Sequence, residues 1–146
     1  VKSQTQMEAY WNHRVAVMKL RQWIELIANW FESPDIRAIN NRPTLTDADF
    51  HQAYYANTKV TCDTCAVVRR VLREQLGLSN TRPSDNIATL FPDLDIGEVC
   101  FEIGDVLRIS FLDSAMDKLD GSVDSLIRAT QDLRTLPQTS HGLAGD

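Results

Sequence analysis

Two cysteines three residues apart, in Cys62-Asp63-Thr64-Cys65, form the sharpest chemical motif of the sequence. A helix is expected to begin at Asp63 or Thr64, and a helix N-terminus lowers the pKa of a nearby thiol while a second cysteine can resolve a disulfide. This spacing indicates thiol redox chemistry as one interpretation. Redox pairs of this kind normally lie in a βαβ context, which the sequence lacks, and Cys65 falls on an apolar stripe. A structural role for both cysteines is the preferred interpretation.

Metal binding is the other chemistry that this pair suggests. A zinc site needs four ligands, and Cys100 and His51 are candidates for the third and fourth if folding brings them together. The three histidines, His13, His51 and His141, are scattered through the chain, with no nucleophile or carboxylate at a suggestive spacing. They are interpreted as surface residues, and the sequence predicts neither a metal nor another cofactor.

A row of acids is the third candidate. It consists of Asp93, Asp95, Glu98, Glu102 and Asp105. Such a row suggests a cation site or a pair of catalytic carboxylates. The spacing is not that of a calcium loop, and acids on one side of an amphipathic helix are most often a solvated face. The row is therefore expected to face solvent.

The helix that carries these acids is expected to span residues 94 to 109, with Asp93 or Asp95 capping its first turn. Its predicted inward residues are Val99, Ile103, Val106 and Leu107, beside Cys100 and Phe101. An earlier helix is expected from residue 63 or 64 to Leu76, where Gly77 stops it. Its apolar stripe is Cys65, Val68, Val71, Leu72 and Leu76, and Arg69, Arg70 and Arg73 are predicted toward the opposite face.

The remaining elements follow from caps, turn residues and apolar periodicity. An aromatic-rich helix is predicted from residue 8 to 31, followed by a loosely packed connector over 32–45. Thr46 is predicted to cap a helix over 47–57 that buries Phe50, Ala53 and Tyr54. Ile87, Leu90 and Phe91 are expected to anchor the long loop 78–91. A short helix over 113–119, an Asp120-Gly121 turn and a last helix capped by Ser122 complete an all-α fold.

Composition limits the function. The 146 residues carry a net charge of -5, and the half from Gly77 onward has five basic against twelve acidic residues. This acidic balance argues against a nucleic-acid partner, whose phosphates require a basic face. The sequence has no run of about 18 apolar residues that would span a membrane. Three cysteines, an odd number, favour a reducing compartment, so a cytoplasmic location is expected.

Residues 64 to 134 resemble the acyl carrier protein family in the order and length of the expected helices. Val-Val-Arg-Arg-Val-Leu-Arg-Glu-Gln-Leu-Gly-Leu over 67–78 is similar to the first helix of that family, and Asp95-Ile96-Gly97-Glu98-Val99 is similar to the acidic start of its second. The resemblance implies a four-helix bundle, here with an N-terminal helical extension. It also implies that the acidic helix is the surface which basic partner proteins recognise.

The family attaches a phosphopantetheine arm to the serine of an Asp-Ser-Leu motif. Alignment on Leu94 places Asp93 at that serine, and a carboxylate cannot become the phosphodiester. The sequence Asp124-Ser125-Leu126 repeats the motif, but only 21 residues follow Ser125. That is too few for the helices that would have to follow. The resemblance therefore implies a carrier fold without its prosthetic group.

Together these observations predict an N-terminal helical arm and connector over 1–61, a carrier-like bundle over 62–136 and a flexible tail over 137–146. The expected function is a non-enzymatic interaction module that binds a protein with a basic surface through the acids of helix 94–109. The alternative is a thiol redox or metal-binding protein that uses Cys62 and Cys65.

Overall fold

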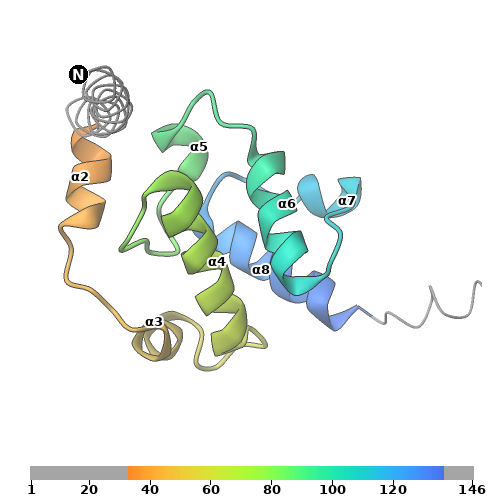
Figure 1. Ribbon diagram of the computed structural model, residues 1–146. Coiled ribbons are helices and arrows are strands. Elements are labelled where there is room, and N and C mark those ends of the chain that lie inside the picture. Colours follow the sequence, from red (N-terminus) through yellow and green to blue (C-terminus); the bar gives the residue numbers. More distant parts are fainter. Residues whose placement is uncertain (1–32, 137–146) are drawn as a thin grey trace, which may run out of the picture. The chain divides into compact units, whose positions relative to one another are not determined.

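The computed structural model describes residues 33 to 136, and residues 35 to 136 belong to one compact unit. Figure 1 shows the helices, which are α2 (Pro34–Asn40), α3 (Asp47–Tyr54), α4 (Cys62–Leu76), α5 (Ile87–Leu90), α6 (Ile96–Leu107), α7 (Asp113–Met116) and α8 (Val123–Thr135). Within the described residues there is no strand, only a single bridge between Asn86 and Ser122. The predicted all-α class is confirmed for this part of the chain. The predicted helix 8–31 and the tail 137–146 lie outside the described residues.

Helix α4 is the centre of the unit, because α3, α6 and α8 all pack against it. Thr61 caps its first turn by accepting a hydrogen bond from the Thr64 amide, and Gly77 ends it in the left-handed region at φ 68°. The predicted end of the helix at Gly77 is thus confirmed, and glycine suits this position because it has no Cβ to clash. Cys65, Val68 and Leu72 are fully buried, as the apolar stripe predicted.

The turn before α8 also holds the long loop in place. The Gly121 carbonyl accepts a hydrogen bond of 2.7 Å from the Ile87 amide, which joins the loop to this turn. Gly121 has φ 88°, and a Cβ there would lie 2.8 Å from Asn86 Oδ1. Ser122 then caps α8 through the Ser125 amide. The predicted turn, the predicted cap and the burial of Ile87 are all confirmed.

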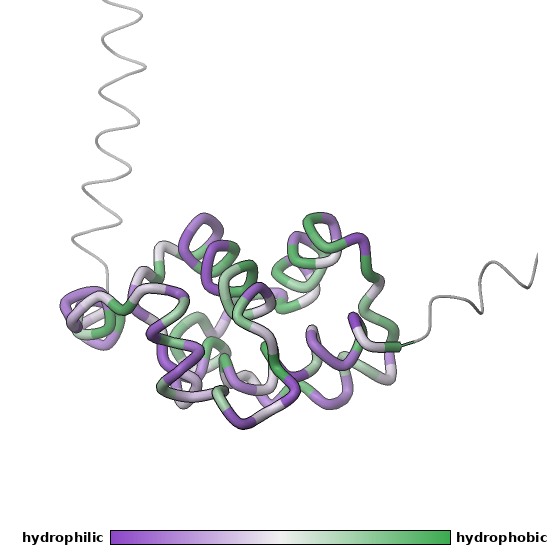
Figure 2. Tube along the Cα trace, turned by 90° about the horizontal axis from the view of Figure 1, so that it is seen from below, coloured by the Kyte–Doolittle hydropathy of each residue, from purple (hydrophilic) through white to green (hydrophobic). Residues whose placement is uncertain are grey.

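Apolar side chains from the helices of the described residues meet in one continuous core, to which α7 contributes only the partly buried Met116. Burying these side chains is the main stabilising contribution to the fold. Figure 2 shows the corresponding alternation of apolar and hydrophilic segments along the helices. The core residues that are at most 2% exposed are Phe50, Tyr55, Val60, Cys65, Val68, Leu72, Leu78, Ile87, Val99, Cys100, Ile103, Val123, Leu126 and Ile127.

The segment predicted as a loose connector is instead partly helical. Pro34 begins α2, where its missing N–H removes no helical hydrogen bond. Ile39 is buried, and Asn40 donates a hydrogen bond of 2.9 Å to the Gly77 carbonyl at the end of α4. Arg42 forms two hydrogen bonds with the Asp85 carboxylate, at 2.7 and 2.9 Å. These contacts with distant residues fix the segment, and they cannot be read from its local composition.

Several predicted side-chain positions are also corrected. Helix α3 ends at Tyr54, earlier than the predicted residue 57. Ala53 and Tyr54, which were predicted to be buried, are exposed, and Tyr55, just after the helix, is buried instead. On α6, Phe101 and Val106 point outward rather than into the core. No helix of the described residues is long and apolar enough to cross a membrane.

Candidate functional site

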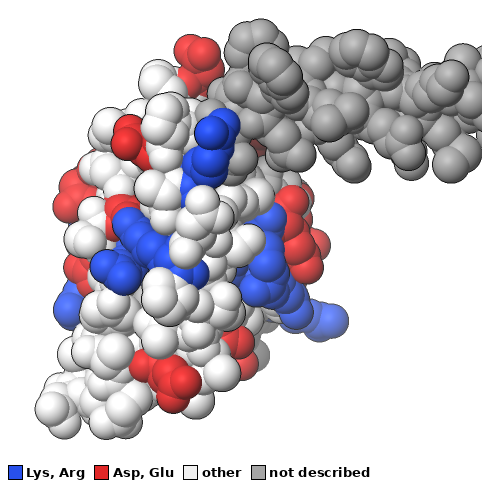
Figure 3. All heavy atoms as spheres, turned by 90° about the vertical axis from the view of Figure 1, so that its left-hand side faces the viewer, with Lys and Arg blue, Asp and Glu red and all other residues white. Residues whose placement is uncertain are grey.

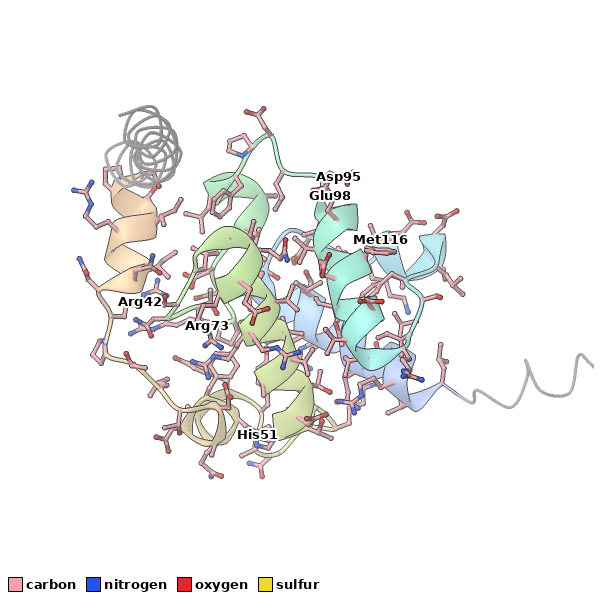
Figure 4. The ribbon with its side chains drawn as sticks, in the orientation of Figure 1. Arg42, His51, Arg73, Asp95, Glu98 and Met116 are labelled. Carbon is pink, nitrogen blue, oxygen red and sulfur yellow. The ribbon has the colours of Figure 1, made fainter. Side chains whose placement is uncertain are left out.

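The acids predicted as an interaction surface lie on or just before α6. Asp95, Glu98, Glu102 and Asp105 follow one another at steps of three or four residues, so they occupy neighbouring positions along the helix. Four of the five acids are exposed, Asp93 among them, and Glu102 is half-buried. Figure 4 shows Asp95 and Glu98 at the first turn of α6. The expectation that the row faces solvent agrees with this placement.

Asp95 has a second role at the start of α6. Its Oδ1 atom accepts a hydrogen bond of 2.9 Å from the Gly97 amide, which satisfies one of the free N–H groups of the first turn. Glu98 also lies in this turn, where a negative charge is stabilised by the helix dipole. Of the two caps that the sequence suggested, Asp95 is therefore the one observed.

The charges on α6 have no counter-charges within the described part of the chain. Five ion pairs occur between residues 33 and 136, and none of them includes Asp93, Asp95, Glu98, Glu102 or Asp105. Like charges spaced three and four residues apart on a helix repel one another. A basic partner that approached α6 would relieve this repulsion.

Phe101 stands between two hollows on this surface. Its side chain is 72% exposed, the largest exposure among the large apolar side chains of the described residues. On one side lies a hollow of about 520 Å³, lined by residues that include Cys100, Phe101, Ile109, Phe111 and Met116. Figure 4 shows Met116 beside α6 at this hollow. On the other side lies a hollow of about 300 Å³, whose lining includes Gln75, Asp95, Glu98 and Glu102.

Two glycines shape the α6 surface around Phe101. Gly97 lines both hollows, and a Cβ at this position would lie 3.0 Å from Asp95 Oδ1. Gly104 is buried where the chain folds back at the end of α6, and a Cβ there would lie only 2.5 Å from the Ile109 carbonyl oxygen. Arg108 takes the left-handed conformation, φ 56°, at this end. Both glycines line the hollow beside α7, and a side chain at Gly104 would collide with the backbone at Ile109.

We define the α6 face as Asp93, Asp95, Glu98, Phe101, Glu102 and Asp105. The sequence identified the five acids but placed Phe101 inside the core. The signal for Phe101 was present in its spacing, because it follows Glu98 by three residues and precedes Asp105 by four. A strict reading of α6 periodicity would have placed Phe101 with the acids.

The cysteine pair has the environment of structural thiols more than of reactive ones. Cys65 is fully buried, and burial, together with a smaller contribution from Cys62, raises its pKa to about 11. Burial likewise raises the pKa of Cys100 to about 11. All three cysteines of the chain are free thiols, and only Cys62 is partly exposed. Because the thiolate is the nucleophile, Cys65 and Cys100 are poor nucleophiles at neutral pH.

The suggested zinc ligands do not assemble among the described residues. No group of three or more His, Cys, Asp or Glu side chains between 33 and 136 has the arrangement of a metal site. His51, the suggested fourth ligand, lies with its Nε2 atom 2.7 Å from the Val60 carbonyl oxygen. His13 and His141 lie outside the described residues.

A polar network that the sequence did not indicate joins α4 to α8. The Gln131 Oε1 atom is its centre and accepts hydrogen bonds from the Thr61 amide, at 3.0 Å, and from the Thr64 hydroxyl, at 2.6 Å. Arg134 donates to the same Thr64 hydroxyl and pairs with Asp63. Gln131 and Thr64 are buried, so these bonds fix the register of the two helices rather than serve a ligand.

Comparison with known proteins adds no relative. No protein-family model, no curated protein and no solved structure matches the chain.

Proposed function

We propose that this protein is a non-enzymatic interaction module, similar to an acyl carrier protein without its prosthetic group, which binds a basic protein partner through the α6 face. The observation that carries the proposal is the exposure of Phe101 among acids that have no counter-charge within the described residues. An exposed aromatic side chain surrounded by charge is a common anchor of protein interfaces.

The order of the helices supports the carrier-like part of the proposal. Helix α4, a long loop that contains the one-turn α5, then α6, the short α7 and α8 follow one another, and apart from α5 this is the order that the resemblance implies. Asp93 is exposed in a turn shortly before α6. In the proposed alignment it stands where the family carries its modified serine, so a carboxylate would replace the attachment point and add one more negative charge to the α6 face.

The two hollows beside Phe101 define the partner's chemistry. The hollow near Gln75 is lined by three acids, Asp95, Glu98 and Glu102, and suits Lys or Arg side chains. The hollow beside α7 is lined by Ile109, Phe111 and Met116 and suits an apolar side chain. A partner segment with basic residues next to an apolar anchor matches both hollows. Charge complementarity of this kind increases the association rate and selects among partners.

Charge reversal on α6 tests this proposal. Proteins captured from a cell extract by the wild-type chain would be identified, and the affinity of each purified protein for the E98K/E102K double variant would be measured. We expect at least about a tenfold loss of affinity at low salt, together with a weakening of the wild-type complex as salt is added. The matched control, D49K/E74K, makes the same change in net charge at exposed acids of α3 and α4 and should bind normally.

Equal losses of affinity in the two variants would mean that only net charge matters, and this would remove the α6 face from the proposal. Unchanged affinity of E98K/E102K would also remove it, because Glu98 and Glu102 would then not contact the partner.

The absence of an arm is tested separately. Incubation of the full chain with coenzyme A and a phosphopantetheinyl transferase, followed by intact-mass measurement, should leave the mass unchanged because Asp93 has no hydroxyl to modify. An authentic acyl carrier protein in the same reaction is the positive control. An adduct on Ser125, in the repeated Asp-Ser-Leu sequence, would contradict the proposed alignment, although Ser125 already donates to the Ser122 carbonyl at 2.8 Å.

A further inference from the structure

Helix α4 has side chains of opposite charge toward its two sides. Gln75 lines the hollow of about 300 Å³ together with acids of α6 such as Glu98, so this side of α4 faces α6. Arg73 precedes Gln75 by two residues. Two residues correspond to about 200° around a helix, which places Arg73 on the opposite side. Figure 4 shows Arg73 and Arg42 on the side of α4 away from α6.

Three more arginines lie on the side of α4 that carries Arg73. Arg69 precedes Arg73 by four residues, so the two are neighbours along the helix. Arg82 lines a small cavity together with Arg69. Arg42 donates a hydrogen bond of 3.2 Å to the carbonyl of Asn80, which lines the same cavity. We define the arginine face as Arg42, Arg69, Arg73 and Arg82, with the adjoining Pro43 and Leu45.

Two of these four arginines have no counter-charge within the described residues. Arg42 and Arg69 are each paired with an aspartate, whereas Arg73 and Arg82 are exposed and take part in none of the five ion pairs. The face therefore keeps two free positive charges. Glu74, the next residue of α4, is turned about 100° away from Arg73. Figure 3 shows this side of the unit, with Lys and Arg side chains gathered near its middle.

The arginine face also has accessible apolar surface. Pro43 is exposed and Leu45 is half-buried, and both line the cavity beside the exposed Arg82. Asn80 and Thr81, which also line it, are only 8% and 3% exposed, so they offer little polar surface. An aromatic ring can pack on such an apolar surface, and a guanidinium over the ring adds a cation–π attraction. Free basic charge thus lies next to apolar surface, which is what the α6 face requires of a partner.

We propose that the α6 face of one copy of this chain binds the arginine face of a second copy. Arg73 and Arg82 would lie among the acids of α6, and Phe101 would pack against Pro43 and Leu45. This inference rests on the proposed role of the α6 face and names its partner. Because the two faces lie on opposite sides of α4, one chain cannot bring its own two faces together.

The proposed contact joins two different surfaces and is therefore heterologous. A twofold pair that used the α6 face alone would place five acids of one copy against five of the other, and these would repel. A contact between opposite sides leaves one free face at each end of a pair, so that further copies can be added. The expected association is open-ended and increases with concentration.

Salt separates this contact from the effect of net charge. Each copy carries a net charge of -5, so copies repel one another at long range. At about 0.1 M salt the screening length is about 10 Å, which screens much of this repulsion but leaves the attraction between charges in contact. At about 1 M the screening length is about 3 Å. We therefore expect association at about 0.1 M salt and a weaker association at about 1 M.

Sedimentation velocity of the purified full chain tests this inference. A contact with few charge pairs binds in roughly the 0.1 mM range, so the series extends from about 10 to 500 μM. We expect the average mass to rise above that of the monomer as concentration increases. R73E/R82E should weaken the association at least about tenfold. The control R70E/K118E makes the same change in net charge at exposed residues outside both faces and should associate as the wild type does.

A mixture of two variants tests the geometry. R73E/R82E keeps the α6 face and E98K/E102K keeps the arginine face, so each variant alone should remain monomeric. Mixed in equal amounts, they retain one wild-type contact, and we expect a complex that stops at two copies. All four substituted residues are largely accessible, and circular dichroism checks that both variants are folded.

Three outcomes would overturn the inference: a wild-type chain that is monomeric at every concentration, an association that R73E/R82E leaves unchanged, or no complex in the mixture. The capture experiment with a basic partner remains a separate test of the proposed function, because it does not involve the arginine face.

Discussion

Two regions of this protein differ in whether their charged and polar side chains are paired with one another. Where α3, α4 and α8 meet, they are paired: Arg69 with Asp47, Tyr55 with Asp124, and Gln131 with Thr64. We call these six residues the paired region. On the α6 face, five acids have no counter-charge within the described residues and an aromatic ring stands in solvent.

The difference separates residues that hold the fold from residues left available for a partner. In the paired region every pair has a buried member, and an unpaired buried polar group is costly, so each partner is needed for stability. The acids of α6 remain largely in water, where the lack of a counter-charge costs little. Substitutions in the paired region should therefore reduce stability, and substitutions on the α6 face should reduce binding.

The largest loss of stability is expected from Arg69→Met. This change removes a buried cation that donates to Asp47 and to the Leu45 carbonyl, and it should lower the free energy of unfolding by about 2–3 kcal/mol. The estimate lies below the range for fully buried pairs because the Asp47 side chain is 48% exposed and partly screened. Urea denaturation measures the effect. The control Arg70→Met, on an exposed arginine, should remain within about 0.5 kcal/mol of the wild type.

A smaller loss is expected from Tyr55→Phe. The Tyr55 hydroxyl donates a hydrogen bond of 2.6 Å to Asp124 Oδ1, and Arg128 holds the same carboxylate from one helical turn further on. Removal of this hydrogen bond should lower the free energy of unfolding by about 1 kcal/mol. Tyr54→Phe, at the exposed neighbour, is the matched control and should have almost no effect. Equal effects from the two variants would contradict the assignment of Tyr55 to the paired region.

Tyr55 also gives a dependence on pH. Burial raises its pKa, and the hydrogen bond to the Asp124 carboxylate raises it further, so the folded state disfavours the phenolate. A raised pKa of this kind contributes stability that is complete below the unfolded value of about 10 and is lost above it. The raised pKa values of Cys65 and Cys100 also reduce the stability of the folded state at high pH, but they do so equally in the wild type and in Tyr55→Phe. The wild type should therefore lose more stability than Tyr55→Phe as the pH rises above about 10.

The smallest effect on stability is expected from Phe101→Ala. The side chain is 72% exposed, so the free energy of unfolding should change by less than about 0.5 kcal/mol, while partner affinity falls as in the charge-reversed variant. Leu112→Ala is the control, because Leu112 is 59% exposed and lines neither hollow. A loss of stability as large as that of Tyr55→Phe would mean that Phe101 packs against the fold, and the contrast between the two regions would fail.

The sequence by itself determined the local features. Thr46 and Ser122 cap their helices through the amide three residues later, as predicted, and Gly77 ends α4. A cap involves atoms only a few residues apart, so its energy is decided within one helical turn. The all-α class follows for the same reason, since apolar periodicity is a property of each segment alone.

Tertiary structure decided where the covered face of α4 and of α6 ends. Arg69 was expected on the outer face of α4 and is buried, because Asp47 and the Leu45 carbonyl from another segment satisfy its charge. Phe101 was expected in the core and is exposed, because the neighbours of α6 cover the side that carries Val99 and Ile103. Periodicity shows that a helix has an apolar stripe, but the position and polarity of neighbouring elements fix its edges. Those neighbours lie 20 or more residues away for Arg69, beyond the reach of any local pattern.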